Sequence, residues 1–130
     1  MAVSSNGNTP ATFNATASRS QWLKGVLELC LLSIIGGGGG DVYGYEVRQQ
    51  LEAAGFGEIK GGTVYPRLAA LEKAGLVETE WRQGTSGPGR KYYRLTPAGA
   101  AHQAEANTEY RLFSDVIHTM LSKNETETKT

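Results

Sequence analysis

The sequence has little of several features that mark particular classes of protein. Its one cysteine, Cys30, excludes an internal disulfide framework and a multi-cysteine zinc site. No segment approaches the ~18 apolar residues that a membrane-spanning helix needs. Its 13 lysine and arginine residues balance its 13 acidic residues, so the total charge does not favour a nucleic-acid partner. These absences predict one small soluble domain in a reducing compartment, the cytoplasm, with no membrane partner, metal or cofactor.

Both ends of the chain are polar. Residues 1–19 carry one base, Arg19, and no acid. Such segments bury too little apolar surface to offset the entropy that is lost when a chain becomes ordered. We therefore expect a disordered N-terminal tail over 1–19, a polar tail over 124–130, and a folded part between them.

The spacing of apolar residues predicts three helices in the first half of the folded part. The first, over 22–35, is apolar on more than one side and ends at a run of five glycines. The second runs over about 43–54. The third runs to Ala74, with Thr63 as its N-cap and Pro66 in its first turn, where a missing amide hydrogen costs little.

Two strand-like segments follow, over 76–82 and 90–95, and a Gly/Pro-rich segment between them is typical of a hairpin tip. Thr96 as N-cap and Pro97 as first helical residue then begin a last helix, which we expect to extend to about Lys123. This order is that of a winged helix-turn-helix, a mainly α fold with a small β-hairpin (α+β). In such a fold the third helix is presented to the major groove of DNA.

Local charge favours this interpretation although the total charge is zero. Residues 60–94 contain seven bases and three acids, a net charge of +4, so the rest of the chain carries −4. The bases are Lys60, Arg67, Lys73, Arg82, Arg90, Lys91 and Arg94, and the acids are Glu72, Glu78 and Glu80. Phosphate contact depends on local cations rather than on the total. Helix order and charge together favour DNA binding over an ordinary solvated surface.

The third helix and the hairpin supply the candidate DNA contacts. Val64, Leu68 and Leu71 define a buried face of the helix, and the opposite face is small enough to approach a groove closely. The slim hairpin tip, with bases at its foot, is suited to a minor groove or to phosphates. The candidate DNA-binding residues are Lys60, Thr63, Tyr65, Pro66, Arg67, Lys73, Gly87, Pro88, Arg90 and Lys91.

The sequence offers no strong catalytic or metal-binding pattern. Residues 84–91 resemble a phosphate-binding loop only superficially, because Arg90 stands where lysine is required and a strand follows instead of a helix. His102 and His118 are 16 residues apart on one helix, so they cannot jointly bind one metal ion within it. We therefore expect a binding protein rather than an enzyme.

The last helix carries an apolar stripe whose members recur at intervals of 4, 3, 4 and 3 residues, which is typical of a coiled-coil seam. They are Ala106, Tyr110, Phe113, Ile117 and Met120. In a monomer the same stripe could pack on the first helix. Because the helix is long for so small a body and a DNA reader gains from two-fold symmetry, we expect a homodimer whose shared core is formed by both helices. The expected boundaries are 20–96 for the DNA-binding domain and 97–123 for the dimerisation helix.

Four segments of the sequence resemble the PadR-type transcriptional regulators. They are VYGYE (42–46), GTVYPRL (62–68), LEKAGLV (71–77) and RKYYRLT (90–96), in the order found in that family. The resemblance covers roughly residues 20–123. The single C-terminal helix is similar to that of the short branch of the family.

The resemblance implies a homodimeric repressor that binds an inverted-repeat operator in double-stranded DNA and releases it when a small molecule binds. In family members that molecule is often a phenolic compound or a planar aromatic drug, and in some short members it lies at the dimer interface. The implied dimer and effector residues are Trp22, Tyr110, Phe113, Ile117 and Met120. The alternative is a winged-helix module that binds another protein and not DNA.

Overall fold

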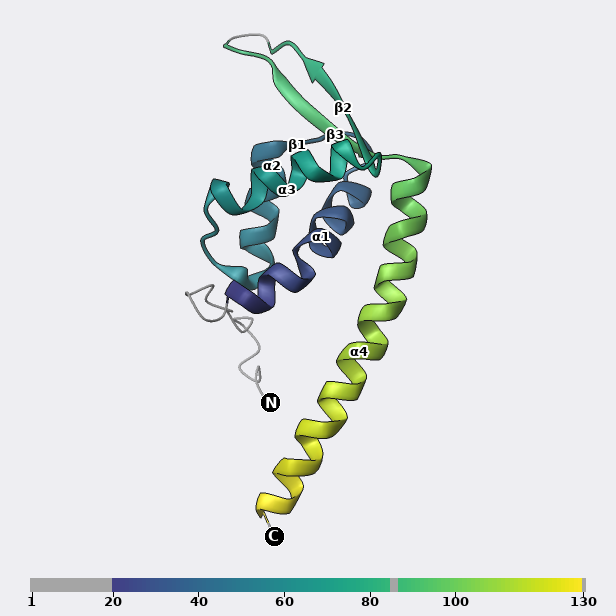
Figure 1. Cartoon of the computed structure of the whole chain (residues 1–130). Helices are drawn as coiled ribbons and strands as arrows, with labels where there is room; N and C mark the ends of the chain where they lie inside the picture. Colours follow the sequence, from purple (N-terminus) through teal and green to yellow (C-terminus); the bar gives the residue numbers. More distant parts are fainter. Residues whose placement is uncertain (1–19, 85–86, 130) are drawn as a thin grey trace.

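The computed structural model describes residues 20–84 and 87–129 and shows a helical body, a small sheet and one long helix that extends past both (Figure 1). The helices are α1 (Ser20–Gly37), α2 (Gly44–Leu51), the short π-helical η1 (Glu52–Phe56), α3 (Gly61–Lys73) and α4 (Pro97–Lys129). The strands are β1 (Val42–Tyr43), β2 (Val77–Arg82) and β3 (Arg90–Leu95). This mainly helical α+β arrangement confirms the predicted fold class. None of these helices combines the length and the apolar character that crossing a membrane requires.

The core lies where α1, α2 and α3 meet the sheet. The adjacent residues Leu31 and Leu32 of α1 are both fully buried, so α1 packs against other elements on more than one side, as predicted. Other elements complete the core with Val47, Leu51, Val64, Leu68, Leu71, Val77 and Tyr93. Burying each of the aliphatic side chains contributes about 1.5–3 kcal/mol, and this core fixes the position of α3 against the sheet.

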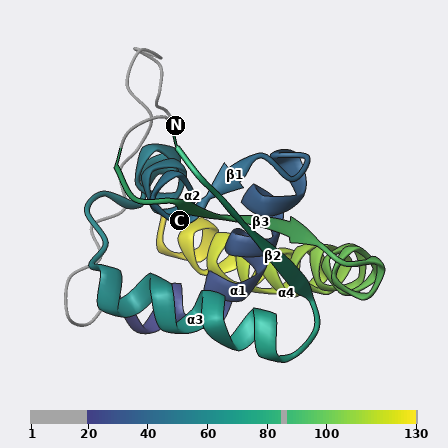
Figure 2. The same ribbon diagram turned by 90° about the horizontal axis from the view of Figure 1, so that it is seen from above.

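The sheet has three strands in the order β1-β3-β2, and both pairings are antiparallel. Seen from above, β2 lies between β3 and α3, and the hairpin crosses over α1 (Figure 2). The sequence predicted only the two hairpin strands. It missed β1 because two residues are too few to show a period of two, and the Val42–Tyr43 pair directly precedes a helix.

Two predicted helix boundaries were wrong. The second helix, expected over 43–54, begins at Gly44 and changes to a π-helical turn after Leu51. The third helix begins at Gly61, so its N-cap is Lys60 and not Thr63. The Thr63 amide donates to the Lys60 carbonyl oxygen at 2.9 Å, which places Thr63 inside the first turn. Thr63 is a good capping residue, but the helix starts two residues before it, at Gly61, which packs against the Tyr65 ring as described below.

The start of α4 is fixed as predicted. The Thr96 hydroxyl accepts a hydrogen bond from the Gly99 amide at 3.0 Å, the geometry of an N-cap, and Pro97 is the first helical residue. A Cβ at Gly99 would collide with the Leu76 carbonyl oxygen, so only glycine allows α4 to pack this closely on the start of β2.

The end of α4 differs from the prediction. The helix extends to Lys129, so residues 124–129, which were expected to form a polar tail, are helical. No glycine or proline follows Lys123 to end the helix. The expected N-terminal tail, 1–19, lies outside the described residues.

Candidate nucleic-acid interface

The exposed face of α3 is low and carries two cations. Val64, Leu68 and Leu71 are buried, which confirms the predicted inner face of the helix. Its other face consists of the exposed residues Pro66, Arg67, Ala69, Ala70 and Lys73. Because alanine and proline project little from the helix, its backbone can approach a flat or grooved partner closely, with Arg67 and Lys73 reaching beyond them.

Tyr65 is held between the first turns of two helices. A Cβ at Gly61 would lie 2.9 Å from Cε2 of the Tyr65 ring, and one at Gly44 would lie 3.4 Å from Cε1 on the other side. The ring therefore occupies a slot whose walls are the backbone at the starts of α2 and α3, and 40% of the residue remains exposed. This packing gives Gly44 of the VYGYE segment and Gly61 of α3 a physical role in orienting Tyr65.

Side chains of α2 and η1 hold the turn that leads into α3. The Arg48 Nε donates to the Ile59 carbonyl oxygen at 2.7 Å, and the Ile59 amide donates to Oε2 of Glu52 at 2.9 Å. Both backbone groups of Ile59 thus have side-chain partners, one from α2 and one from η1, while its side chain is buried in the core. These bonds hold the residue that directly precedes Lys60, the N-cap of α3.

The bases of residues 60–94 fall into two groups. Three of them form ion pairs with the three acids of the same segment at N···O distances of 3.0–3.3 Å: Lys91 with Glu72, Arg82 with Glu80, and Arg94 with Glu78. In the described part of the chain, no carboxylate lies within 4 Å of the charged nitrogens of the other four, Lys60, Arg67, Lys73 and Arg90. The net charge of +4 predicted for this segment therefore belongs to those four residues.

One carboxylate joins α3 to both strands of the wing, the name used here for β2, β3 and the loop between them. Glu72 accepts from the Lys91 Nζ at 3.0 Å through Oε1 and from the Thr79 hydroxyl at 2.8 Å through Oε2. These hydrogen bonds lower the pKa of the Glu72 carboxyl, and the bond that Lys91 donates to Glu72 raises the pKa of the Lys91 ammonium. Glu72 keeps the wing at a fixed position relative to α3. Sequence reasoning counted it only as an acid, since its partners lie 7 and 19 residues away.

The opposite face of the wing is tied to the glycine-rich loop. The Arg82 guanidinium donates to the Gly40 carbonyl oxygen and to Oδ1 of Asp41, each at 3.0 Å. It also lies 4.1 Å from the centre of the Tyr92 ring. The five-glycine run therefore leads into a loop that is fastened to the wing, and Arg82 is occupied by this contact.

The remaining hairpin candidates lie at the tip of the wing and directly beside it. Gly87 and Pro88 are exposed at the tip, next to residues 85–86, which lie outside the described part of the chain. Arg90, at the foot of the tip, is exposed, and its guanidinium lies 4.5 Å from the centre of the Tyr43 ring. The structure thus groups Arg90 with β1 rather than with α3.

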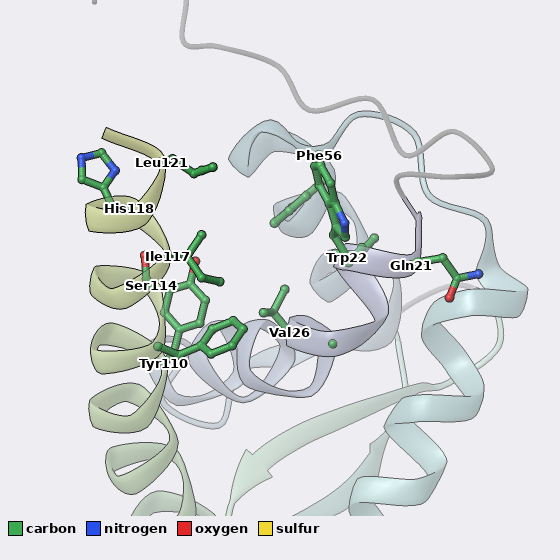
Figure 3. Close-up of a pocket in the computed structure, with 12 residues that line it drawn as sticks. Gln21, Trp22, Val26, Phe56, Tyr110, Ser114, Ile117, His118 and Leu121 are labelled. Carbon is green, nitrogen blue, oxygen red and sulfur yellow. The ribbon is translucent and has the colours of Figure 1, made fainter. Parts of the chain in front are cut away.

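A groove lies between the start of α1 and the second half of α4, far from the wing (Figures 1 and 3). Its volume is about 770 Å³, and Trp22 and Val26 of α1 face Tyr110 and Ile117 of α4 across it. We call it the α4 groove. Its lining includes four of the five predicted dimer and effector residues, Trp22, Tyr110, Phe113 and Ile117, but not Met120.

The apolar surface of α4 continues beyond this groove. Leu112, Val116 and Met120 do not line it, yet each is exposed by 61–64%. Inside the groove Phe113 is 63% exposed and Trp22 is 72% exposed. A single protomer therefore covers neither side of the stripe, and the first helix alone does not bury it.

Comparison with known proteins identifies the family to which these features belong. Residues 31–105, more than half of the chain, match the transcriptional regulator PadR-like family. The chain is a member of the PadR-like family. A PadR-like transcriptional regulator from Bacillus cereus is 37% identical, with 78% of this chain and 96% of that one covered and a TM-score of 0.69. DNA-binding regulation of transcription is the function of this class.

Two further relatives support the same assignment. A Streptococcus transcriptional regulator is 38% identical to this PadR-like chain, with 77% of this chain and 96% of that one covered and a TM-score of 0.68. Transcriptional regulator Rv3488 of Mycobacterium tuberculosis is 40% identical over 65 residues, which are 50% of this chain and 59% of the relative. The resemblance found in the sequence and the winged-helix fold it implied are confirmed.

Proposed function

We propose that this PadR-like protein is a homodimeric repressor that binds an inverted-repeat operator in double-stranded DNA and releases it when a small aromatic molecule binds. The observation that carries this proposal is that two different surfaces, one cationic and one apolar, are exposed at separate places on the molecule. Within the described residues, cations without an ion-pair partner lie on α3 and next to the tip of the wing, and exposed apolar side chains follow α4. A polyanion complements the first surface, and a second copy of the chain complements the other.

In the proposed complex α3 lies in the major groove. The base edges are faced by residues of its first turns, Thr63, Tyr65, Pro66 and Arg67. The phosphates are contacted by the cations at its two ends, Lys60 and Lys73. Arg67 has no ion-pair partner among the residues that the structure describes, which supports this role, since its guanidinium breaks no ion pair when it binds.

The wing contacts the backbone or the minor groove beside α3. Gly87 and Pro88 make its tip narrow, and Arg90 supplies a cation at the foot of the tip. Lys91 meets a phosphate only with the donors that Glu72 leaves free, because an ammonium group has three. We therefore assign Lys91 chiefly to positioning the wing through Glu72.

The dimer forms when the α4 helix of each copy covers the groove and the exposed stripe of the other. Contiguous apolar surface on a helix that extends past its own domain is typical of such an interface. An isologous dimer presents two α3 helices related by a two-fold axis, which matches an operator whose half-sites are inverted repeats.

The effector site lies in the α4 groove, where Trp22, Tyr110 and Phe113 offer aromatic faces for a planar or phenolic molecule. A ligand there acts on the packing between α1 and α4. Because α4 is packed tightly on the start of β2 at Gly99, a change in its angle alters the separation of the two α3 helices and lowers operator affinity.

A gel-shift titration with an inverted repeat taken from the DNA flanking the coding region tests the docking. Arg67→Ala is expected to weaken binding by about 1–3 kcal/mol if the guanidinium reads a base. Arg94→Ala is the matched control, because it removes a wing arginine that Glu78 already neutralises, and its effect is expected to stay within about 0.5 kcal/mol. The proposed docking is contradicted if Arg67→Ala and Arg94→Ala weaken operator binding equally. It is also contradicted if neither Arg67→Ala nor Lys91→Ala weakens it.

A further inference from the structure

We propose that Trp81 contacts the sugar-phosphate backbone of DNA between the major groove entered by α3 and the site reached by the wing tip. This inference rests on the proposed docking of α3 and adds a residue that sequence reasoning did not select. Three features of β2 carry it: the side of the strand on which Trp81 lies, its exposure, and the chemistry of its neighbours.

The register of the wing places Trp81 on the side that faces α3. Successive residues of a strand alternate between its two faces, so Thr79 and Trp81 share one face of β2. The Thr79 hydroxyl bonds Glu72 of α3. Trp81 is paired across the strands with Lys91, whose ammonium bonds the same carboxylate. Trp81 is therefore the next residue outward from the contact between α3 and the wing.

Trp81 is left unburied at this position. Val77, on the same face at the base of β2, is 2% exposed, whereas Trp81 is 69% exposed. Within the described residues it has no hydrogen-bond or ring partner. A buried tryptophan removes 150–250 Å² from water, so a ring left open on a two-stranded ribbon adds little to the stability of the fold. Its surface is available to a partner.

The charges on the face of Trp81 favour a polyanionic partner. Glu72, the acid on this face, is neutralised by Lys91, and the unpaired cation Lys73 follows it on α3. An indole offers an apolar body that packs on a deoxyribose and one N–H that donates to a phosphate oxygen. The α4 groove, the proposed dimer surface, lies at the other end of the molecule (Figure 1), so a second copy of the chain does not cover Trp81 there.

A backbone contact by a neutral side chain has a distinctive signature. It carries no sequence information, so its loss weakens binding to the operator and to unrelated DNA by the same factor. It releases no counterion, so its loss leaves the salt dependence of binding unchanged, whereas loss of a phosphate-binding lysine reduces the slope by about 1. These two properties separate Trp81 from both a base reader and a cation.

The test measures binding of the full chain to labelled operator and to a shuffled duplex between 50 and 200 mM salt, the range over which phosphate contacts are resolved. Trp81→Ala is expected to weaken binding to both duplexes by about 2- to 10-fold, with an unchanged salt slope, and Trp81→Phe by less. Lys73→Ala is the comparison that changes the slope. Unlabelled operator is also expected to alter the tryptophan emission of the wild type but not that of Trp81→Phe.

Affinities of Trp81→Ala within error of the wild type for both duplexes, or a loss confined to the operator, overturn the backbone contact. If Arg67→Ala weakens operator binding while Trp81→Ala does not, only this inference fails. If neither variant changes binding, the proposed docking of α3 fails as well. Thermal unfolding of both Trp81 variants is expected to match the wild type, because the side chain is exposed.

Discussion

The wing and the second half of α4 leave different kinds of surface unsatisfied. Around the wing, every acid of residues 60–94 is paired with a base, and the surplus is four cations. Along α4, the surplus is apolar side chains on both sides of one helix. A neutral chain can thus carry a surface for a polyanion and a surface for itself, because what matters is which groups remain after internal pairing and packing.

A charge placed in the apolar stripe should produce the largest effect. Phe113→Asp is expected to convert the dimer to a monomer, because burying an unpaired carboxylate costs several kcal/mol. Sedimentation velocity measures the change. Ser122→Asp adds the same charge about 180° around α4 from Phe113, on the side away from the stripe, and is expected to leave the dimer intact. An intact Phe113→Asp dimer, or a dissociated Ser122→Asp protein, would show that the stripe is not the interface.

Moving Tyr65 without removing it should produce a smaller effect at the other surface. Gly61→Ala places a Cβ 2.9 Å from the ring and forces it to shift, whereas Gly62→Ala adds the same methyl group into open space. Operator affinity is expected to fall by about 1–2 kcal/mol for the first variant and to stay unchanged for the second, by analogy with the loss of one base or phosphate contact. Equal affinities would remove Tyr65 from the DNA contacts.

Removing the negative charge of Glu72, between α3 and the wing, should have the smallest effect. That effect is a loss of stability, and it should depend on pH. Glu72 has a lowered pKa in the folded protein, so its contribution to stability is fully present above its ordinary pKa of about 4.5 and is lost as the pH falls through the lower folded value. Glu72→Gln is expected to lower the free energy of unfolding near pH 7 by at most about 1 kcal/mol, as for other half-exposed ion pairs.

Thermal unfolding over a pH series checks this dependence. The difference between the wild type and Glu72→Gln should shrink as the pH falls below 4.5. Glu105→Gln, which makes the same substitution on the exposed surface of α4, is the control and is measured over the same pH series. If the wild type remained more stable than Glu72→Gln at the lowest pH values, Glu72 would act through something other than its charge.

Local signals were sufficient to predict much of the fold. The apolar spacing of α1 and α3, the Gly/Pro segment between β2 and β3, and Thr96 before Pro97 each act within a few residues, and the structure agrees with them. The exposed stripe of α4 was also visible as a periodicity. The two-residue β1 and the early start of α3 depend on contacts with distant elements and had no comparable local signal.

The candidate site was predictable as a region but not residue by residue. The charge of +4 over 60–94 follows from the sequence, whereas its assignment to particular residues required the pairing of Lys91 with Glu72 and of Arg82 with Asp41 and Glu80. Those pairs join residues on different elements. Trp81 could have been noticed as an aromatic residue that continues the Val77–Thr79 face of β2 beyond the core.

Hydroxyl-radical footprinting of the operator with the wild-type protein tests most directly whether paired copies place two α3 helices on one duplex. We predict two protected segments related by the inverted repeat, with centres about 10–10.5 base pairs, or a multiple of that, apart. A single protected segment at saturating protein, or two segments that persist at the same protein concentration in Phe113→Asp, would contradict the account.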